Sequence, residues 1–174
     1  GMVTLGTGIG NLTPLQSVTI SGNAASESPE FAIATLGNIQ LQNLTAPQGL
    51  SLSSQNGGIY ASLLSTVNRT NAGNVTLSGK TISLTGINTQ SIDGTGGTVD
   101  ITATDFFRAR GTFVDLNQIE ASISTAGALG GGSIVLRHGG NGETPFVVGD
   151  ASLNGTAGVM TRGTEPGDTI AAGN

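Results

Sequence analysis

The residues best suited to chemistry lie together at 137–150, in the stretch RHGGNGETPFVVGD. This stretch contains the only histidine, His138, with Glu143 and Asp150 close by in the sequence. A catalytic triad would also need an activated nucleophile, and the chain has many serines but no Gly-x-Ser-x-Gly elbow. A zinc site would need about three ligands from His, Cys, Asp or Glu, and the chain has no cysteine. We therefore expect His138 to pack or to form a hydrogen bond at the end of a strand.

Two further motifs match ligand-binding loops only in part. GGNGE at 139–143 resembles half of a calcium-binding glycine-rich repeat, a device that holds ions between successive copies of the motif. GNVTLSGKT at 73–81 has five residues between the first glycine and Gly-Lys-Thr, where a phosphate-binding loop has four. That loop must also open a helix, and the TISLTG that follows is typical of a strand. We predict no metal-binding residue, no cofactor-binding residue and no cofactor.

Acidic residues around one predicted coil are the remaining candidates for catalysis. Asp93, Asp100 and Asp105 are followed by Arg108 and Arg110. Carbohydrate lyases and hydrolases built on parallel β-helices use clusters of Asp, Arg and Lys on one outer face, and paired catalytic carboxylates must lie a defined distance apart. No Asp-Asp pair occurs in the chain. Scattered solvating charges are the favoured interpretation, and a carbohydrate-active site that uses Asp100, Asp105 and Arg108 is the alternative.

Composition favours an all-β protein with many turns. Charged residues make up 10% of the chain and glycine accounts for 29 of its 174 residues, against roughly 25% and ~7% in an average domain. Glu and Lys, which favour helices, are scarce, whereas β-branched and turn-forming residues are common. The net charge of -5 argues against a nucleic-acid partner. No segment approaches the ~18 apolar residues of a membrane span.

A short pattern recurs in which one residue, usually polar, separates two aliphatic residues. This period of two is typical of a strand with one buried face. The pairs are Val18/Ile20, Ile39/Leu41, Val75/Leu77, Val99/Ile101 and Ile134/Leu136. From Val18 the steps are 21, 36, 24 and 35 residues, and the shorter steps fit one coil of three short strands. We interpret the longer steps as coils with insertions, around 55–72 and 112–130.

These repeats favour a right-handed parallel β-helix, a solenoid of about six coils with inserted loops, over a hairpin-linked β-sandwich. We expect residues 1–150 to form the β-helix segment and residues 151–174 a C-terminal extension or irregular cap. The Gly-Met start, GMVTLGTGIG, has no charged beginning and no long apolar run. We expect the chain to be a fragment of a longer protein.

Two stretches resemble filamentous-haemagglutinin-like exoproteins. IGNLTPLQSVTISG at 9–22 is similar to an element of these proteins in which TPL precedes a strand. GGSIVLRHGGNGETPFVVGDASLNGTAGVMTRG at 131–163 is similar to a segment of their cyanobacterial members. The resemblance implies a right-handed β-helical passenger, secreted or associated with the outer membrane and exported by two-partner secretion through a transporter partner.

The same resemblance implies what such a segment does. The stalks of these proteins present adhesive surfaces, so a carbohydrate or a cell-surface protein is the expected partner. No catalytic or binding residue of the family carries over to these positions. We therefore expect a non-enzymatic structural and adhesive segment at the cell surface, whose inserted loops and polar faces meet partners weakly and multivalently.

Overall fold

Three sheets of short strands make up most of the described protein. The computed structural model describes residues 2–4, 6, 8–9, 14–165 and 167–173. Their strands form sheets of nine, six and seven members, which we call sheets A, B and C. The one helical element in these residues is η1 (Gly140–Gly142), a 3-10 turn, and no helix among them is long and apolar enough to cross a membrane. The expected all-β class is therefore confirmed.

Every strand in the described residues has two to five residues. Sheet B contains β2 (Gly8–Ile9), β5 (Phe31–Thr35), β8 (Leu50–Ser54), β11 (Val75–Gly79), β14 (Val99–Ala103) and β18 (Ile134–His138). Sheet C contains β3 (Val18–Ile20), β6 (Ile39–Leu41), β9 (Ile59–Tyr60), β12 (Ile82–Leu84), β15 (Phe107–Ala109), β20 (Gly155–Thr156) and β19 (Val147–Val148). Sheet A contains β1 (Met2–Thr4), β4 (Asn23–Ala25), β7 (Leu44–Thr45), β10 (Leu63–Ser65), β13 (Gly86–Asn88), β16 (Phe113–Val114), β17 (Glu120–Ser124), β21 (Val159–Thr161) and β22 (Thr169–Ile170).

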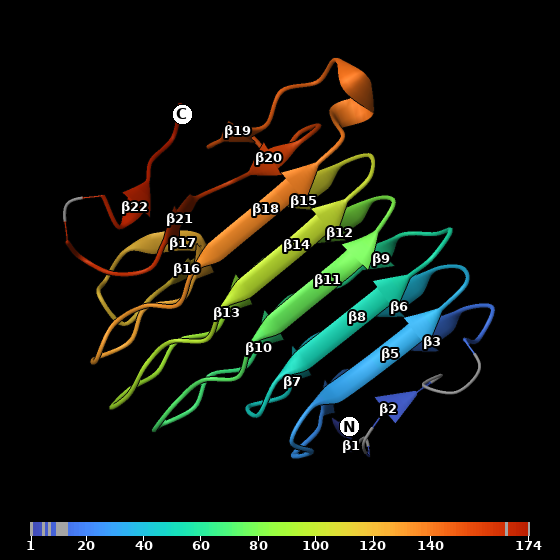
Figure 1. The fold of residues 1–174 in the computed structure, drawn as a ribbon, viewed down its shortest axis with the longest axis horizontal. Helices are drawn as coiled ribbons and strands as arrows, with labels where there is room; N and C mark the ends of the chain where they lie inside the picture. The colour runs from blue at the N-terminus through green and yellow to red at the C-terminus, as the bar shows by residue number, and fades with distance from the viewer. Residues whose placement is uncertain (1, 5, 7, 10–13, 166, 174) are drawn as a thin grey trace.

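The chain passes through the three sheets in one repeated order. After β1, a strand of sheet B is followed by one of sheet C and then one of sheet A, and we call each such set a circuit. Equivalent strands of successive circuits pair in parallel, as β11 does with β8 on one side and with β14 on the other. Figure 1 shows sheet B in front, its strands side by side from β5 in blue to β18 in orange. The antiparallel pairs β16–β17 and β21–β22 depart from this pattern.

The core lies between the inward faces of the three sheets. On sheet B, Leu77 is aligned with Leu52 and Ile101 in the neighbouring strands, and each is at most 1% exposed. On sheet C, Ile82 is aligned with Phe107, and both are fully buried. Every second residue of a strand enters this core and the residues between point outward. Burial of each large apolar side chain contributes about 1.5–3 kcal/mol, so these stacked columns hold the circuits together.

The alignment of the strands corrects our interpretation of the repeat spacing. The first two aliphatic pairs lie in sheet C and the last three in sheet B. The step from Ile39 to Val75 therefore joins two different sheets, and the insertion expected at 55–72 is wrong, because this range contains β9 and β10. Each sheet has one inward face, so alternation alone does not distinguish the sheets. The step from Val99 to Ile134 does stay within sheet B, and it contains the extra strand β16.

Glycine and asparagine are abundant because the corners of neighbouring circuits touch. Gly97 lies before β14, and a β-carbon there would overlap the backbone carbonyl of Gly73 in the preceding circuit. Asn74 accepts a hydrogen bond from the backbone N–H of Thr98, one circuit later, at 2.9 Å. The recurrent Gly-Asn and Gly-Thr steps before the aliphatic pairs are therefore explained by close stacking of the corners.

The stacking continues into residues 151–174. In this range β20 pairs in parallel with β15, and β21 pairs in parallel with β17. The chain then turns back, and β22 runs antiparallel to β21. The division that we expect at residue 150 stays a prediction.

Candidate functional site

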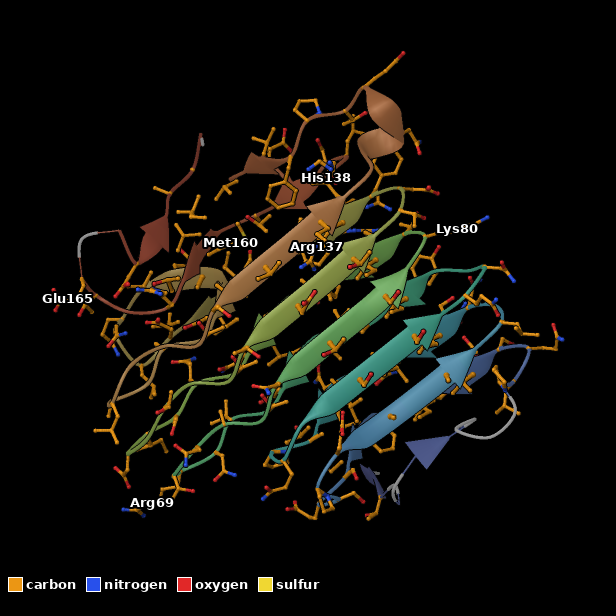
Figure 2. All side chains as sticks on the ribbon, in the orientation of Figure 1. Arg69, Lys80, Arg137, His138, Met160 and Glu165 are labelled. Carbon is orange, nitrogen blue, oxygen red and sulfur yellow. The ribbon has the colours of Figure 1, made fainter. Side chains whose placement is uncertain are left out.

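His138 ends β18 and forms part of a hydrogen-bonded corner. The amide nitrogen of Asn154 lies 3.0 Å from its Nδ1, and because an amide nitrogen can only donate, Nδ1 accepts this bond. The imidazole also packs against Phe146, with 5.5 Å between the ring centroids. Figure 2 shows His138 at the end of β18, next to the segment that leads to β19. The expectation that this side chain packs and hydrogen-bonds is confirmed.

Asn154 organises this corner from a buried position, with 2% of its surface exposed. Its Oδ1 accepts a hydrogen bond from the backbone N–H of Phe107 at 3.0 Å. Its Nδ2 also donates to the carbonyls of Thr144 and Pro145, at 3.2 and 3.3 Å. No hydrogen bond found in the described residues joins His138 to a carboxylate or a hydroxyl. The corner therefore connects β15, β18 and the segment after η1.

The two acidic residues near His138 point to solvent. Glu143 is exposed, and so is Asp150. Hydrogen bonds from the side chain and the backbone N–H of Ser152 hold the pKa of Asp150 below its ordinary value. Within the described residues, no group of three or more His, Cys, Asp or Glu side chains is placed to hold a metal ion.

The residues of the predicted catalytic alternative lie on different sides of the molecule. Asp100 points outward from β14 in sheet B and pairs with Arg137 of β18 at 2.7 Å. Asp105 lies past the end of β14, at the corner where the chain turns toward sheet C. Arg108 follows on β15, in the outward position of sheet C between two buried residues. A corner between two sheets thus separates the arginine from Asp100.

Asp93 lies before β14 in the chain, at the end of this strand opposite to Asp105. Its carboxylate pairs with Arg69 at 2.8 Å, whereas the backbone N–H of Asp105 donates to the carbonyl of Lys80 at 2.9 Å. Figure 2 shows Arg69 and Lys80 at opposite corners. The five residues of β14 place these corners at least ~13 Å apart. The three carboxylates therefore do not face one another in the way that paired catalytic carboxylates do.

The segment that resembles a phosphate-binding loop is part of the stacked sheets. Residues 75–79 form β11 and residues 82–84 form β12, so Lys80 lies in a corner between two strands. No helix begins in this segment, and the backbone donors that a helix N-terminus would offer to phosphate are absent from it. The expectation that a strand follows this motif is confirmed.

A shallow groove on the outer face of sheet C is a candidate binding site. It has a volume of about 390 Å³, and its lining includes Gln40, Tyr60, Ser83, Thr85 and Arg110. A second hollow of about 180 Å³ shares Gln40 with it and extends it along β3 and β6. The combined groove crosses strands β3, β6, β9 and β12 and ends beside the residue that follows β15.

Tyr60 provides the aromatic surface of this groove. The side chain points outward from β9 and is 38% exposed. A β-carbon at Gly58 would lie 2.8 Å from its hydroxyl oxygen and 2.9 Å from its Cε2. The tip of the ring therefore lies close to Gly58. A β-carbon there would also meet the backbone carbonyl of Thr81 at 2.7 Å, so this position favours glycine.

Reading the sequence alone did not identify this groove. Gln40, Tyr60 and Ser83 are neighbours only because the register of β6, β9 and β12 aligns them. The single tyrosine of the chain was the one available signal. Comparison with known proteins adds no relative to this description: no family model, curated protein or solved structure matches the chain.

Proposed function

We propose that this chain is a non-enzymatic structural and adhesive segment of a secreted or cell-surface exoprotein, in which it acts as a rigid β-helical stalk. One observation carries the proposal: equivalent strands of successive circuits pair in parallel and in register on all three sheets. We interpret the circuits as six coils of a right-handed parallel β-helix, since crossover connections between parallel strands are almost always right-handed.

Such a stack is suited to a mechanical role. Each coil contacts its neighbours, and stability grows with every interface between coils. At a spacing of ~4.8 Å per coil, six coils make a rod segment roughly 30 Å long. The core columns and the backbone hydrogen bonds run along the whole segment, so bending it would break contacts in several coils at once.

The outer surface is suited to presenting weak contacts to a binding partner. The outward positions of sheet B carry small side chains, among them Ser51, Ser53, Thr76, Ser78 and Thr102. Such a surface remains soluble and leaves room for weak contacts, which gain strength when many copies act together. The resemblance to filamentous-haemagglutinin-like exoproteins supports export through a transporter partner, a place at the outer membrane, and a carbohydrate or cell-surface protein as the partner.

A carbohydrate-active enzyme is the competing class, and the geometry weighs against it. Asp100 is engaged by Arg137, and Asp105 and Arg108 do not share a face with it. Asp100, Asp105 and Arg108 are the residues that an enzymatic alternative would need.

Adhesion and hydrolysis can be tested on one preparation. Microspheres coated with the folded chain should attach to polysaccharide-coated or cell-coated surfaces more than microspheres coated with the urea-unfolded chain. Incubation with polysaccharides should release no reducing ends above a blank. Equal attachment of the two kinds of microsphere would overturn the adhesive role, and release of reducing ends that Asp100→Asn abolishes would overturn the non-enzymatic role.

A further inference from the structure

We propose that the groove on the outer face of sheet C binds a linear polysaccharide that carries carboxylate groups. The inference rests on the proposed adhesive function, because it names the class of partner that this stalk would hold. Four observations carry it: the direction of the groove, the ring of Tyr60, the free polar side chains of the lining, and the arginines at one end.

The groove is long and runs across the strands. Outward residues are aligned from strand to strand in the order Thr19, Gln40, Tyr60, Ser83 and Arg108. Four strand spacings separate the first of these from the last, which corresponds to roughly 19 Å. A groove of this length, open along its course, fits an extended chain better than a compact molecule, and a polysaccharide is an extended chain with one repeating unit after another.

The ring of Tyr60 offers a flat apolar surface in the middle of the row. The tip of the ring lies beside Gly58, and 38% of the residue is exposed to the groove side of the sheet. A flat apolar face flanked by polar groups matches a pyranose ring, whose C–H groups lie on one side and whose hydroxyls lie at the rim.

The polar side chains around this ring are free to meet hydroxyl groups. No hydrogen bond found in the described residues uses the side chains of Gln40, Ser62 or Thr85, which all line the groove. Amide and hydroxyl groups can both donate and accept, as sugar hydroxyls do. A sugar chain can therefore hydrogen-bond to these groups without breaking a hydrogen bond found within the described protein.

The charge at the β15 end of the groove is positive and uncompensated. Three arginines elsewhere pair with carboxylates, whereas Arg108 and Arg110 have no ion pair among the described residues. The Nε of Arg108 is buried and has no hydrogen-bond partner in the described structure. A ligand would therefore meet Arg108 through the terminal nitrogens of its guanidinium group, and an arginine beside carboxylate oxygens gains strong charge-assisted hydrogen bonds.

A sugar chain that carries carboxylates can interact both with the aromatic middle of the row and with its arginine end. Its ring stacks on Tyr60 and its hydroxyls meet Gln40 and Thr85, while an acidic group farther along the chain reaches Arg108 or Arg110. The aligned row from Thr19 to Arg108 contains no acidic residue that would repel it. Local charge therefore favours an acidic ligand even though the whole chain carries -5.

Calorimetric titration of the whole chain with oligogalacturonates tests the proposal. We expect saturable binding that weakens as salt is added, because the ion pairs are screened. A neutral galactose oligomer of equal length should bind roughly tenfold more weakly or worse. Tyr60→Ala should weaken oligogalacturonate binding roughly fivefold, and Tyr60→Phe should retain it. Arg110→Gln and Arg108→Gln should each reduce the affinity, whereas Arg69→Gln, an equal change of charge at a distant exposed corner, should not.

Circular dichroism of each variant shows whether it folds. If Arg108→Gln fails to fold, Arg110→Gln alone carries the test, because that side chain is exposed. Equal binding of acidic and neutral oligomers, equal losses from Arg69→Gln and Arg110→Gln, or no binding to wild type would each overturn the proposal. Cleavage of the oligomers would overturn the non-enzymatic function and leave the groove in place as the binding site. If the chain does not bind the oligomers but coated microspheres still adhere, only the binding role of the groove would be overturned.

Discussion

Shortening Ile101 to alanine should destabilise the protein about three times as much as the same change at Leu136. The two residues are aligned inward positions of β14 and β18 on sheet B. Ile101 is fully buried and lies between Leu77 and Leu136 in one column. Leu136 belongs to the last strand of sheet B and is only partly buried. The pair therefore compares the middle of the stacked core with its end.

The expected magnitudes follow from what each change removes. Ile101→Ala deletes groups worth about 2.5 kcal/mol of transfer free energy and leaves an enclosed cavity, so we expect a loss of about 3–4 kcal/mol. Leu136→Ala deletes the same volume from a half-buried site that water can reach, so we expect about 1 kcal/mol. Urea unfolding followed by circular dichroism measures both values, and the slope of the transition shows whether cooperativity is kept. Equal losses of unfolding free energy at the two positions would refute the view that the core is fully enclosed at β14 and partly exposed to solvent at β18.

Three other changes probe the corners and the C-terminal hairpin. Gly97→Ala places a β-carbon against the backbone of the preceding circuit and should lower the free energy of unfolding by about 2 kcal/mol or more, measured by the same urea titration. Asn154→Ala leaves the backbone N–H of Phe107 without its acceptor; we expect a loss of about 1–3 kcal/mol and faster amide exchange at residues 139–148. The hydrogen bond from Arg162 holds the pKa of Asp168 below its ordinary value, so its stabilising effect is present above the ordinary aspartate range and is lost as the pH falls through the lowered pKa. Carboxyl NMR should show a low titration midpoint for Asp168 that Arg162→Gln raises.

Local patterns in the sequence predict the strands well and their arrangement only in part. The aliphatic pairs Val75/Leu77 and Val99/Ile101 are buried, as alternation predicts, because a strand's period of two is a property of the backbone itself. The sheet to which each strand belongs depends on the corners before it, and nothing in the alternation encodes that. For this reason the step from Ile39 in sheet C to Val75 in sheet B has the same pattern as a coil with an insertion.

The candidate groove depends still more on long-range alignment. Gln40 and Tyr60 become neighbours only when β6 and β9 pair in register, and Arg108 joins the row only through β12 and β15. His138 depends on long-range packing too. Its hydrogen-bond partner, Asn154, lies between β19 and β20, and no pattern in the sequence predicts this pairing.

Cross-linking of single cysteine pairs tests the stacked, parallel register most directly, because the chain has no cysteine of its own. Ser78 and Thr102 are aligned neighbours on the outer face of sheet B, and Ser53 lies one strand farther along the same row. Adjacent residues of such a row are ~4.8 Å apart, and Ser53 and Thr102 are separated by twice that spacing. Ser78→Cys with Thr102→Cys should be joined rapidly by a short thiol–thiol cross-linker such as dibromobimane, and Ser53→Cys with Thr102→Cys should not. Equal reaction of the two pairs, or reaction of the second pair alone, would contradict the β-helical stalk.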